Sequence, residues 1–491
     1  MARPDDRNTA TRSVWSGVDW LTVALYLAMV LFGVVSIYAA SYDFDHASIF
    51  SFDEFSGKQL RWIGLSLLLG VVLLLIDARM YETYAFPVYV MVVLLLLVTP
   101  FLAPDIKGSH SWLVIGPMSL QPAEFAKFAT ALALAKLFSG YNFQLNAKVS
   151  NYIKALSIIF IPIVLILLQN ETGSALTFLA LFFVLYREGM SGLILFAALM
   201  AVVVFVVAVK FAQTTIMCIP TGHFSVFVIT QAVMVGMLVV YGKRLEIARN
   251  VLLWFAGTGI LAWILSLCGV ALPGMIFFIS TIMAACVYVV FIAIQRHLSS
   301  LYIAVVTAIG AIAFLFCVNF AFNQLQPHQQ MRIKVALGIE QDLRGAGYNV
   351  NQSKIAIGSG GFAGKGFLNG TQTKLKYVPE QHTDFIFCTI GEEEGFLGAA
   401  AVMALFVCLI LRVISIAERQ PSVFTRVYAY CVASYFIFHF CINIGMVIGL
   451  CPVIGIPLPF FSYGGSSLWG FTLLLFILLK LDAARKSKLS Y

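Results

Sequence analysis

The sequence predicts an all-α polytopic membrane protein, and composition, mean hydropathy and the length of its apolar runs predict it together. Of the 491 residues, 61% are hydrophobic and only 11% are charged, whereas soluble domains carry about 25% charged residues. The mean hydropathy is +0.93. The apolar residues come in runs of about 20, the length of a helix that crosses a bilayer. Membrane strands would instead be segments of about ten residues with alternating polarity, and the sequence shows none.

The apolar runs predict about fourteen membrane spans. They lie near 19–40, 60–77, 83–103, 121–139, 152–169, 173–187, 191–211, 222–241, 250–269, 273–294, 300–322, 386–411, 425–450 and 460–480. The polar start 1–17 leads into the first run without a small-residue cleavage site, so we expect no cleavable signal peptide.

Basic residues predict the orientation of these spans. They gather in the N-terminal segment 1–17, in the loop 243–249 and in the tail 483–491, and an even number of spans places all three on one side. The positive-inside rule makes that side the cytoplasm. We therefore expect a multi-pass protein of the cytoplasmic (inner) membrane with both termini in the cytoplasm and the long loop 323–385 outside.

Charge and cysteine usage argue against a nucleic-acid partner, a zinc site and a disulfide framework. The net charge of +8 does not call for nucleic acid, because Lys and Arg collect on cytoplasmic loops for topological reasons. The nine cysteines form no CxxC pair and lie within or at the edges of apolar runs. We therefore expect no nucleic-acid partner, no zinc site and no disulfide framework.

The loop 323–385 is the longest stretch without a predicted span, and it is rich in glycine. Loops of this length are uncommon unless they are functional. Glycines let backbone amides approach a ligand closely, and successive amides beside Lys365 can cradle phosphate oxygens, although glycine richness alone more often indicates a flexible loop. The GxxxxGK[ST] spacing of a Walker A loop is absent. Residues 349–357 are expected to form a short interfacial helix.

Three polar motifs interrupt the apolar runs. In QPAEFAK, Pro122 suits the first turn of a helix, and Glu124 and Lys127 are three residues apart, so that they share one helix face and can pair. Charges in a membrane span are usually paired or functional. A structural ion pair and contact with a substrate head group both remain open for this motif.

The other two motifs lie at the predicted outer interface. Glu171, in QNETGSA, is either a plain turn acid or a carboxylate that faces an outer cavity. The stretch 443–467 ends one span and starts another, and it places the hydroxyls of Ser462 and Ser466 near the interface. Broken backbone at membrane depth is tolerated only where it is buried in protein or lines a cavity, so a plain turn and a cavity lining both remain open. We expect His439 to be a packing residue rather than a ligand.

These motifs together resemble the SEDS family (shape, elongation, division and sporulation). The matching stretches are QPAEFAK at 121–127, QNETGSAL at 169–176, DLRGAGYNVNQSKIAIGSGGFAGKGFLNGTQ at 342–372, VPEQHTDFIF at 378–387, GEEEGFLG at 391–398 and NIGMVIGLCPVIGIPLPFFSYGGSS at 443–467. The GTQ at 370–372 and the EQH at 380–382 resemble the RodA branch rather than the division branch FtsW.

The resemblance implies a peptidoglycan glycosyltransferase that polymerises lipid II at the outer face of the membrane. It implies a ten-span core with about four inserted spans. The parts would be a cytoplasmic tail 1–17, a first part of the core 18–211, inserted spans 212–299, a second part 300–482 with the catalytic loop 323–385, and a tail 483–491. Implied partners are lipid II, membrane lipid and a class B penicillin-binding protein with transpeptidase activity.

The family's functional residues can be carried over where the motifs match. Its essential loop aspartate corresponds to Asp342 and its loop arginine to Arg332. The expected substrate-binding residues are Glu124, Lys127, Glu171, Arg332, Lys365, His382, Ser462 and Ser466. Two departures stand out: Glu171 replaces the family's aspartate, which moves the carboxylate by one methylene, and Leu343 replaces a proline, which leaves the turn less rigid.

The mechanism implied is general base catalysis. Asp342 would take the proton of the acceptor sugar's hydroxyl, and cations would stabilise the departing pyrophosphate. No cofactor is certain, and a divalent cation, Mg²⁺ or Mn²⁺, stays open. The alternatives are a flippase or transporter of a polyprenol-linked precursor and a scaffold for a transpeptidase. Polar motifs concentrated at the predicted outer end favour the enzyme, because a flippase needs polar groups throughout the membrane depth.

Overall fold

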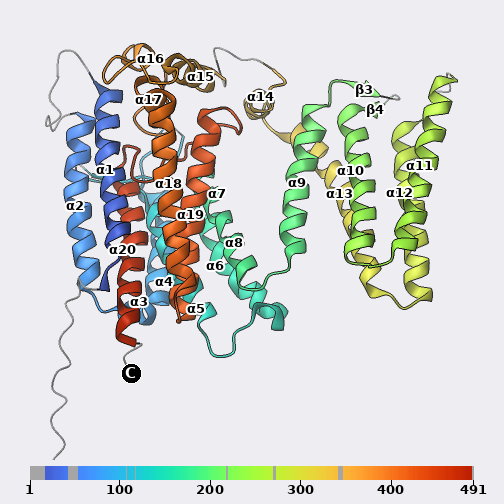
Figure 1. The fold of residues 1–491 in the computed structure, drawn as a ribbon, viewed down its shortest axis with the longest axis horizontal. Coiled ribbons are helices and arrows are strands. Elements are labelled where there is room, and N and C mark those ends of the chain that lie inside the picture. The colour runs from blue at the N-terminus through green and yellow to red at the C-terminus, as the bar shows by residue number, and fades with distance from the viewer. Residues whose placement is uncertain are drawn as a thin grey trace, which may run out of the picture. The chain divides into compact units, whose positions relative to one another are not determined.

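The computed structural model describes residues 17–42, 54–106, 108–116, 118–216, 219–268, 273–340, 345 and 347–488. The chain forms two compact units, the first made of residues 1–190 and 348–491 and the second of 191–347. Figure 1 shows both as helical bundles. The predicted all-α polytopic class is confirmed, and the predicted division at 212–299 remains a prediction.

The first unit contains most of the polar motifs. Its elements are α1 (Trp20–Ser41), α2 (Phe55–Leu75), α3 (Ala78–Thr83), α4 (Ala85–Leu102), β1 (Leu113–Ile115), β2 (Met118–Leu120), α5 (Pro122–Phe138), η2 (Leu145–Ala147), α6 (Val149–Leu168), α7 (Thr172–Thr177), η3 (Phe178–Ala180), α8 (Leu181–Arg187), α15 (Tyr348–Gly360), α16 (Thr371–Lys374), α17 (Ile386–Glu393), α18 (Gly395–Glu418), α19 (Val423–Val447) and α20 (Gly465–Lys488). β1 and β2 pair antiparallel as a short hairpin.

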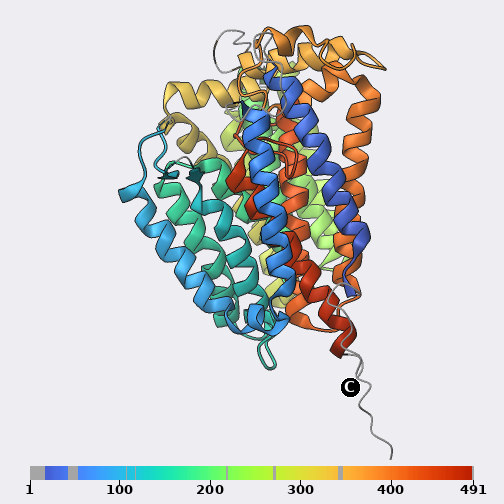
Figure 2. The same cartoon turned by 90° about the vertical axis from the view of Figure 1, so that its left-hand side faces the viewer.

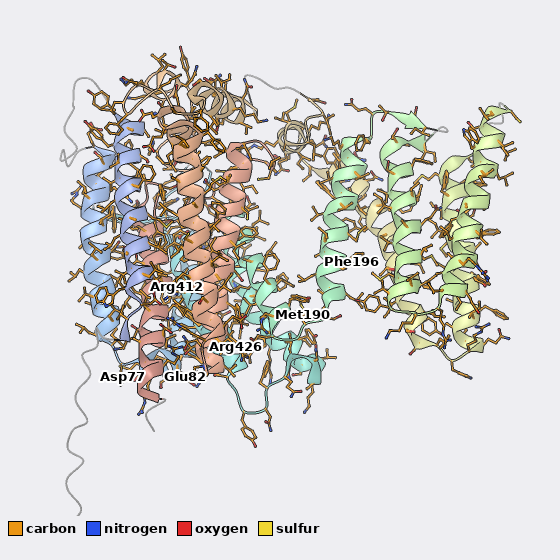
Figure 3. The ribbon with its side chains drawn as sticks, viewed as in Figure 1. Asp77, Glu82, Met190, Phe196, Arg412 and Arg426 are labelled. Atoms are coloured by element: carbon orange, nitrogen blue, oxygen red, sulfur yellow. The ribbon has the colours of Figure 1, made fainter. Side chains whose placement is uncertain are left out.

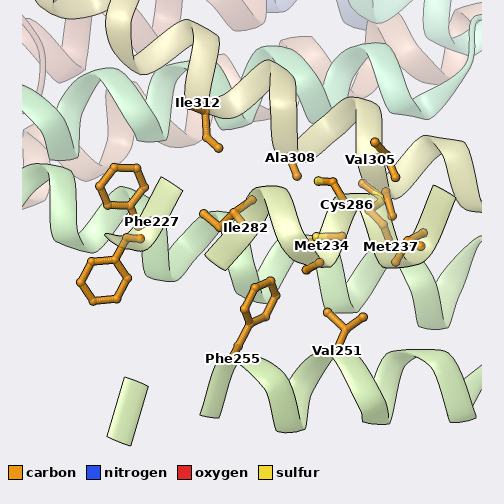
Figure 4. Close-up of a cluster of buried hydrophobic side chains, with 14 of the residues drawn as sticks. Phe227, Met234, Met237, Val251, Phe255, Ile282, Cys286, Val305, Ala308 and Ile312 are labelled. Carbon is orange, nitrogen blue, oxygen red and sulfur yellow. The ribbon is translucent and has the colours of Figure 1, made fainter. Parts of the chain in front are cut away.

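The second unit is simpler. Its elements are α9 (Gly192–Lys210), β3 (Thr215–Ile216), β4 (Ile219–Pro220), α10 (Thr221–Val240), α11 (Leu245–Leu267), α12 (Gly274–Gln295), η4 (Ser299–Leu301), α13 (Tyr302–Gln324) and α14 (Pro327–Ala336). Its apolar core includes Phe227, Met234, Phe255 and Ile282 (Figure 4). Because these side chains come from α10, α11 and α12, the core holds the predicted inserted spans together as one bundle.

Twelve helices among the described residues are long and apolar enough to cross a membrane. The two further predicted spans are α5, which has 17 residues, and the broken run Thr172–Arg187. Each predicted span therefore corresponds to a helix or to a broken helix. The span near 386–411 is divided at Glu394 into α17 and α18, and the starts of α2, α11 and α20 differ from the predicted starts by five residues. The predicted helix at 349–357 is present as α15.

Charged side chains join the terminal helices of the first unit. Asp19, at the start of α1, pairs with Arg412 at 2.6 Å and with Arg419 at 2.9 Å, and Arg419 also pairs with Asp482 near the end of α20. These contacts place the start of α1 and the end of α20 at the same end of the bundle, where Arg412 is labelled in Figure 3. Helices α15, α16 and α17 lie at the opposite end (Figures 1 and 2).

Candidate functional site

The connection between α19 and α20 is a non-helical segment, 448–464, that folds back into the bundle; we call it the re-entrant segment. A Cβ added at Gly33 would lie 2.7 Å from the carbonyl oxygen of Phe460. Gly33 lies eight residues before the end of α1, which corresponds to a depth of about 12 Å at 1.5 Å per residue. The segment is therefore not the plain surface turn that the sequence left open.

Asn443 supplies hydrogen bonds for the backbone of this segment. Its Nδ2 donates to the carbonyl of Ile456 and to that of Asp384, both at 2.8 Å. Non-helical backbone inside a membrane protein needs such internal partners, because the surrounding lipid offers none. Asn443 thus holds the re-entrant segment and the end of the long loop to the same helix, α19.

A buried charged cluster lies below the re-entrant segment. Lys127 Nζ donates to Glu124 Oε1 at 2.8 Å and to His439 Nε2 at 3.0 Å, and His439 Nδ1 lies 3.1 Å from the carbonyl oxygen of Pro457. The ammonium also lies 4.7 Å from the centre of the Phe471 ring, which is within the range of a cation–π interaction. Glu124, Lys127 and His439 are each at most 3% exposed.

The pairing of Glu124 with Lys127 follows from their spacing on α5, whereas the sequence predicted only a packing role for His439 and no contact with this pair. It is buried and satisfied, as expected of a packing residue, yet its partners are a charged side chain and the re-entrant backbone. The available signal was an ionisable residue inside a predicted span, which is functional more often than not.

Glu171, directly before α7, joins its own loop to the loop that precedes β1. Its Oε1 accepts hydrogen bonds from the hydroxyls of Ser109 at 3.0 Å and Ser111 at 2.8 Å. Nearby, Gln121 Nε2 donates to Ser174 Oγ at 3.3 Å. The structure therefore brings the motifs at 121–127 and 169–176 together, with the half-buried carboxylate of Glu171 fixed by serines that precede the β1–β2 hairpin.

The re-entrant segment also holds the end of the long loop. Ser462 Oγ donates to the carbonyl of Thr383 at 2.6 Å, and the Tyr463 amide donates to the carbonyl of His382 at 2.8 Å. The His382 ring stacks on Phe55 with 4.1 Å between ring centroids. Ser462 is 5% exposed and Ser466 is 1% exposed, so the two serines lie inside the protein rather than on its surface.

The glycine-rich part of the loop is anchored by Glu392, a residue of α17 ahead of the candidate span that begins at Gly395. Its Oε1 accepts from Lys365 Nζ and from the Thr371 amide, both at 2.7 Å, and its Oε2 accepts from the Thr373 amide at 2.9 Å. Burial alone would raise the pKa of Glu392, but these bonds outweigh burial and lower the pKa below its ordinary value.

Lys365 is therefore an ion-pair partner of Glu392 and 26% exposed. The sequence suggested Lys365 as a phosphate ligand and did not identify Glu392. The available signal was the run of three acids at 392–394 directly before an apolar stretch, because charges in such a place need partners.

Glu393, the next residue, is buried, and no cation among the described residues forms an ion pair with it. The pKa of its carboxyl is raised from 4.5 to about 7, chiefly by burial; the backbone amides of Leu368 and Gly370 oppose the rise, and the charges of Glu392 and Glu394 add to it. Its Oε1 finds no hydrogen-bond partner among the described residues. A carboxyl in these surroundings favours the protonated form.

Two of the predicted site residues, Arg332 and Asp342, are not among the described residues of the first unit. Arg332 lies on α14 in the second unit, where its side chain is exposed, and the nearby Lys334 pairs with Glu340 at 2.8 Å. Asp342, the predicted general base, and Leu343 lie outside the described residues. The roles proposed for Arg332 and Asp342 therefore remain predictions from the sequence.

Curated relatives extend over nearly the whole chain. The peptidoglycan glycosyltransferase RodA of Treponema pallidum is 30% identical over 463 residues, which covers 92% of this chain and 95% of the relative. The peptidoglycan glycosyltransferase MrdB of Escherichia coli K12 is 28% identical over 467 residues, covering 94% and 93%. A probable peptidoglycan glycosyltransferase FtsW of Trichlorobacter lovleyi is 26% identical and covers 95% and 94%.

Solved structures share the fold. The crystal structure of RodA of Thermus thermophilus is 22% identical, covers 96% of this chain and 99% of its own, and has a TM-score of 0.54. A chain of a peptidoglycan synthase complex, described for the coordination of polymerization and crosslinking, has a TM-score of 0.62 at 23% identity. It covers 95% of this chain and 98% of its own.

The family model described as "Cell cycle protein" (FtsW, RodA and SpoVE) matches residues 19–219 and 249–487. The stretch between these two matches falls within the range 212–299, where the inserted spans are predicted. With most of the chain matched, and with the relatives above, the protein belongs to the FtsW/RodA/SpoVE family, the SEDS family of polytopic membrane proteins.

Proposed function

We propose that this protein is a peptidoglycan glycosyltransferase that polymerises lipid II into glycan strands for cell elongation and rod shape. The observation that carries the proposal is the close relation to proteins of this named activity along almost the full length of both chains. The structure supports it with a buried charged cluster beneath a segment that holds the end of the glycine-rich loop.

The chemical step is an inverting displacement. Asp342 accepts the proton from the 4-hydroxyl of the acceptor sugar, while that oxygen forms a bond to the anomeric carbon of the donor. The bond from the anomeric carbon to the pyrophosphate oxygen breaks, and undecaprenyl pyrophosphate leaves with the electron pair. Cations stabilise the charge that develops on it, and Arg332, Lys365 and Lys127 are the candidates.

The three candidate cations differ in their surroundings. Lys127 is enclosed by Glu124, His439 and Phe471, and Lys365 is paired with Glu392 but partly exposed. Arg332 is exposed on the second unit, and its candidacy rests on the family resemblance. Within the first unit, we rank Lys365 above Lys127 for direct contact with the pyrophosphate.

A divalent cation, Mg²⁺ or Mn²⁺, stays an open option that rests on the family resemblance alone. Among the described residues, no group of three or more His, Cys, Asp or Glu side chains is placed to hold a metal ion.

The proposed setting is the cytoplasmic membrane with the loop outside the cell. The start of α1 and the end of α20 lie at the end of the first unit opposite to its loop helices, which fits cytoplasmic termini and an extracytoplasmic loop under the positive-inside rule. A class B penicillin-binding protein is the expected partner, supported by the solved neighbour from a complex of polymerization and crosslinking.

Polymerisation by the purified protein tests the proposal. The full chain in detergent is given fluorescent lipid II, and the products are separated on a gel. The wild type is expected to make long glycan strands and the Asp342→Ala variant none, whereas Glu340→Gln, a matched change two residues away, should keep the wild-type rate. Asp342→Ala polymerising normally would overturn the assignment of the base. A wild type that moves lipid II across vesicle membranes but makes no polymer would show the flippase instead.

A further inference from the structure

One residue links the buried ion pair to the re-entrant segment. His439 lies on α19 with Lys127 on one side of its ring and the carbonyl of Pro457 on the other. An ammonium group can only donate, so Nε2 of the imidazole accepts from Lys127. Nδ1 then carries the proton and donates to Pro457. The two contacts thus select one neutral tautomer, and each polar atom of the ring is used.

The contacts of Pro457 extend this link to the long loop. Pro457 lies between Ile456, whose carbonyl accepts from Asn443, and Leu458, whose amide donates to Ser462 Oγ at 2.8 Å. Ser462 Oγ in turn donates to the carbonyl of Thr383. A short run of hydrogen bonds therefore leads from Lys127 through His439 and the re-entrant segment to the end of the loop.

Of the two partners of His439, Lys127 is too deeply buried for water to replace the imidazole, and Pro457 is half-buried. Lys127 is 1% exposed and His439 is 1% exposed, and the imidazole and the Phe471 ring form a T-shaped pair with 4.8 Å between ring centroids. A leucine here would fill the space but would leave a donor of Lys127 and the carbonyl of Pro457 unpaired. The unpaired donor of buried Lys127 is expensive, and the half-buried carbonyl of Pro457 loses its protein partner, so the re-entrant backbone would shift to find other partners.

We propose that His439 is a positioning residue, which fixes the re-entrant segment and, through it, residues 382–384 by bonding Lys127 and the Pro457 carbonyl at the same time. The proposal rests on the glycosyltransferase function proposed above. Displacing groups around a reacting centre by about 1 Å can lower the rate by about 100-fold. The loss of this positioning is therefore expected to lower kcat, because His439 acts through the re-entrant segment and does not itself contact substrate.

Three variants of the full chain test this role. His439→Leu keeps the volume but bonds neither neighbour. His439→Gln has an amide oxygen that can accept from Lys127 and an amide nitrogen that can donate to Pro457. Tyr435→Phe is the matched control, one turn away on α19, because its buried hydroxyl has no hydrogen-bond partner among the described residues.

The kinetic result expected is a selective loss of turnover. His439→Leu should lower kcat for lipid II polymerisation by about 10- to 100-fold and change KM by less than about threefold. His439→Gln should recover kcat to within about fivefold of the wild type, and Tyr435→Phe should match the wild type. A folded Leu variant with normal kcat, a Gln variant as slow as the Leu variant, or a loss confined to KM would each overturn the proposal.

Hydrogen exchange separates this proposal from the function on which it rests. In His439→Leu, the backbone amides of the non-proline residues in 457–464 and those of 382–384 should exchange faster than in the wild type, while those of the β1–β2 hairpin should not change. Unchanged exchange at 457–464 would overturn the positioning role even where activity falls. A wild type that makes no glycan would instead refute the proposed function, and the exchange result would still decide the role of His439.

Discussion

Replacing Glu392 with glutamine should release the glycine-rich part of the long loop from the body of the first unit. The carboxylate accepts from Lys365 and from the backbone amides of Thr371, Gln372 and Thr373. In Glu392→Gln, one of the two acceptor atoms becomes an NH₂ group that faces donors. Lys365 also loses the charge that it pairs with.

The size of the effect can be worked out from these contacts. Glu392 is fully buried, and removing one partner of a buried ion pair costs about 3–5 kcal/mol. Because about 1.4 kcal/mol changes an equilibrium tenfold, the open state of the loop should become about 100-fold to about 4,000-fold more populated. The helix α17 itself should be little affected, since its own backbone bonds do not involve this side chain.

Hydrogen exchange of the peptide 366–376 measures this opening directly, because exchange in a docked loop reports its opening free energy. The matched control is Glu394→Gln, in the same acidic run, where burial is the cause that raises the pKa of the carboxyl. The control should exchange like the wild type. If Glu392→Gln also exchanged like the wild type at 366–376, the anchoring role derived from the geometry would be refuted.

Two further predictions concern single positions. The pKa of Glu393 is raised from 4.5 to about 7 in the docked loop. Protonation of Glu393 therefore stabilises the docked loop fully below about pH 4.5, and this contribution is lost as the pH rises to about 7. Hydrogen exchange of 366–376, corrected for its intrinsic pH dependence, should rise from pH 5 to pH 8 in the wild type but not in Glu393→Gln. Gly33→Ala places a Cβ 2.7 Å from the Phe460 oxygen and 2.9 Å from Phe461 Cα, which should cost about 1–3 kcal/mol and lower the Tm, whereas Gly64→Ala, with nothing within 4 Å, should not.

The helical framework could be predicted from the sequence because a single physical quantity decides it. A bilayer core fixes the length of an apolar helix, so every apolar run in the sequence corresponds to a helix or a broken helix in the structure. Spacing likewise predicted the pairing of Glu124 with Lys127, since residues three apart share a helix face. Both relations are local, so a short stretch of sequence is enough to predict them.

The depth of the re-entrant segment could not be predicted in the same way. Prolines and glycines between 452 and 465 fit a surface turn as well as a backbone that folds inward. What decides between them is the space that Gly33 leaves on α1 and the bonds that Asn443 supplies. Both belong to other helices, so the pattern within the segment does not contain the answer.

Partners across long sequence distances explain the remaining misses. Lys365 was predicted to face a phosphate because it follows glycines, but the acid that holds it is 27 residues further along the chain. His439 and Lys127 are separated by 312 residues. Neither pair leaves a periodic trace in the sequence, and only the buried charge itself, which must find a partner, indicated that a contact had to exist.

The two halves of the long loop are therefore held by devices of different kinds. Glu392 binds the glycine-rich half by accepting hydrogen bonds at the loop's own backbone, whereas the end at 382–384 is bonded to the re-entrant segment and, through it, to His439. Loss of the first device frees a segment of the loop. Loss of the second leaves the loop docked but displaces its end. Substitutions at Glu392 should consequently appear first in hydrogen exchange of the loop, and those at His439 first in kcat.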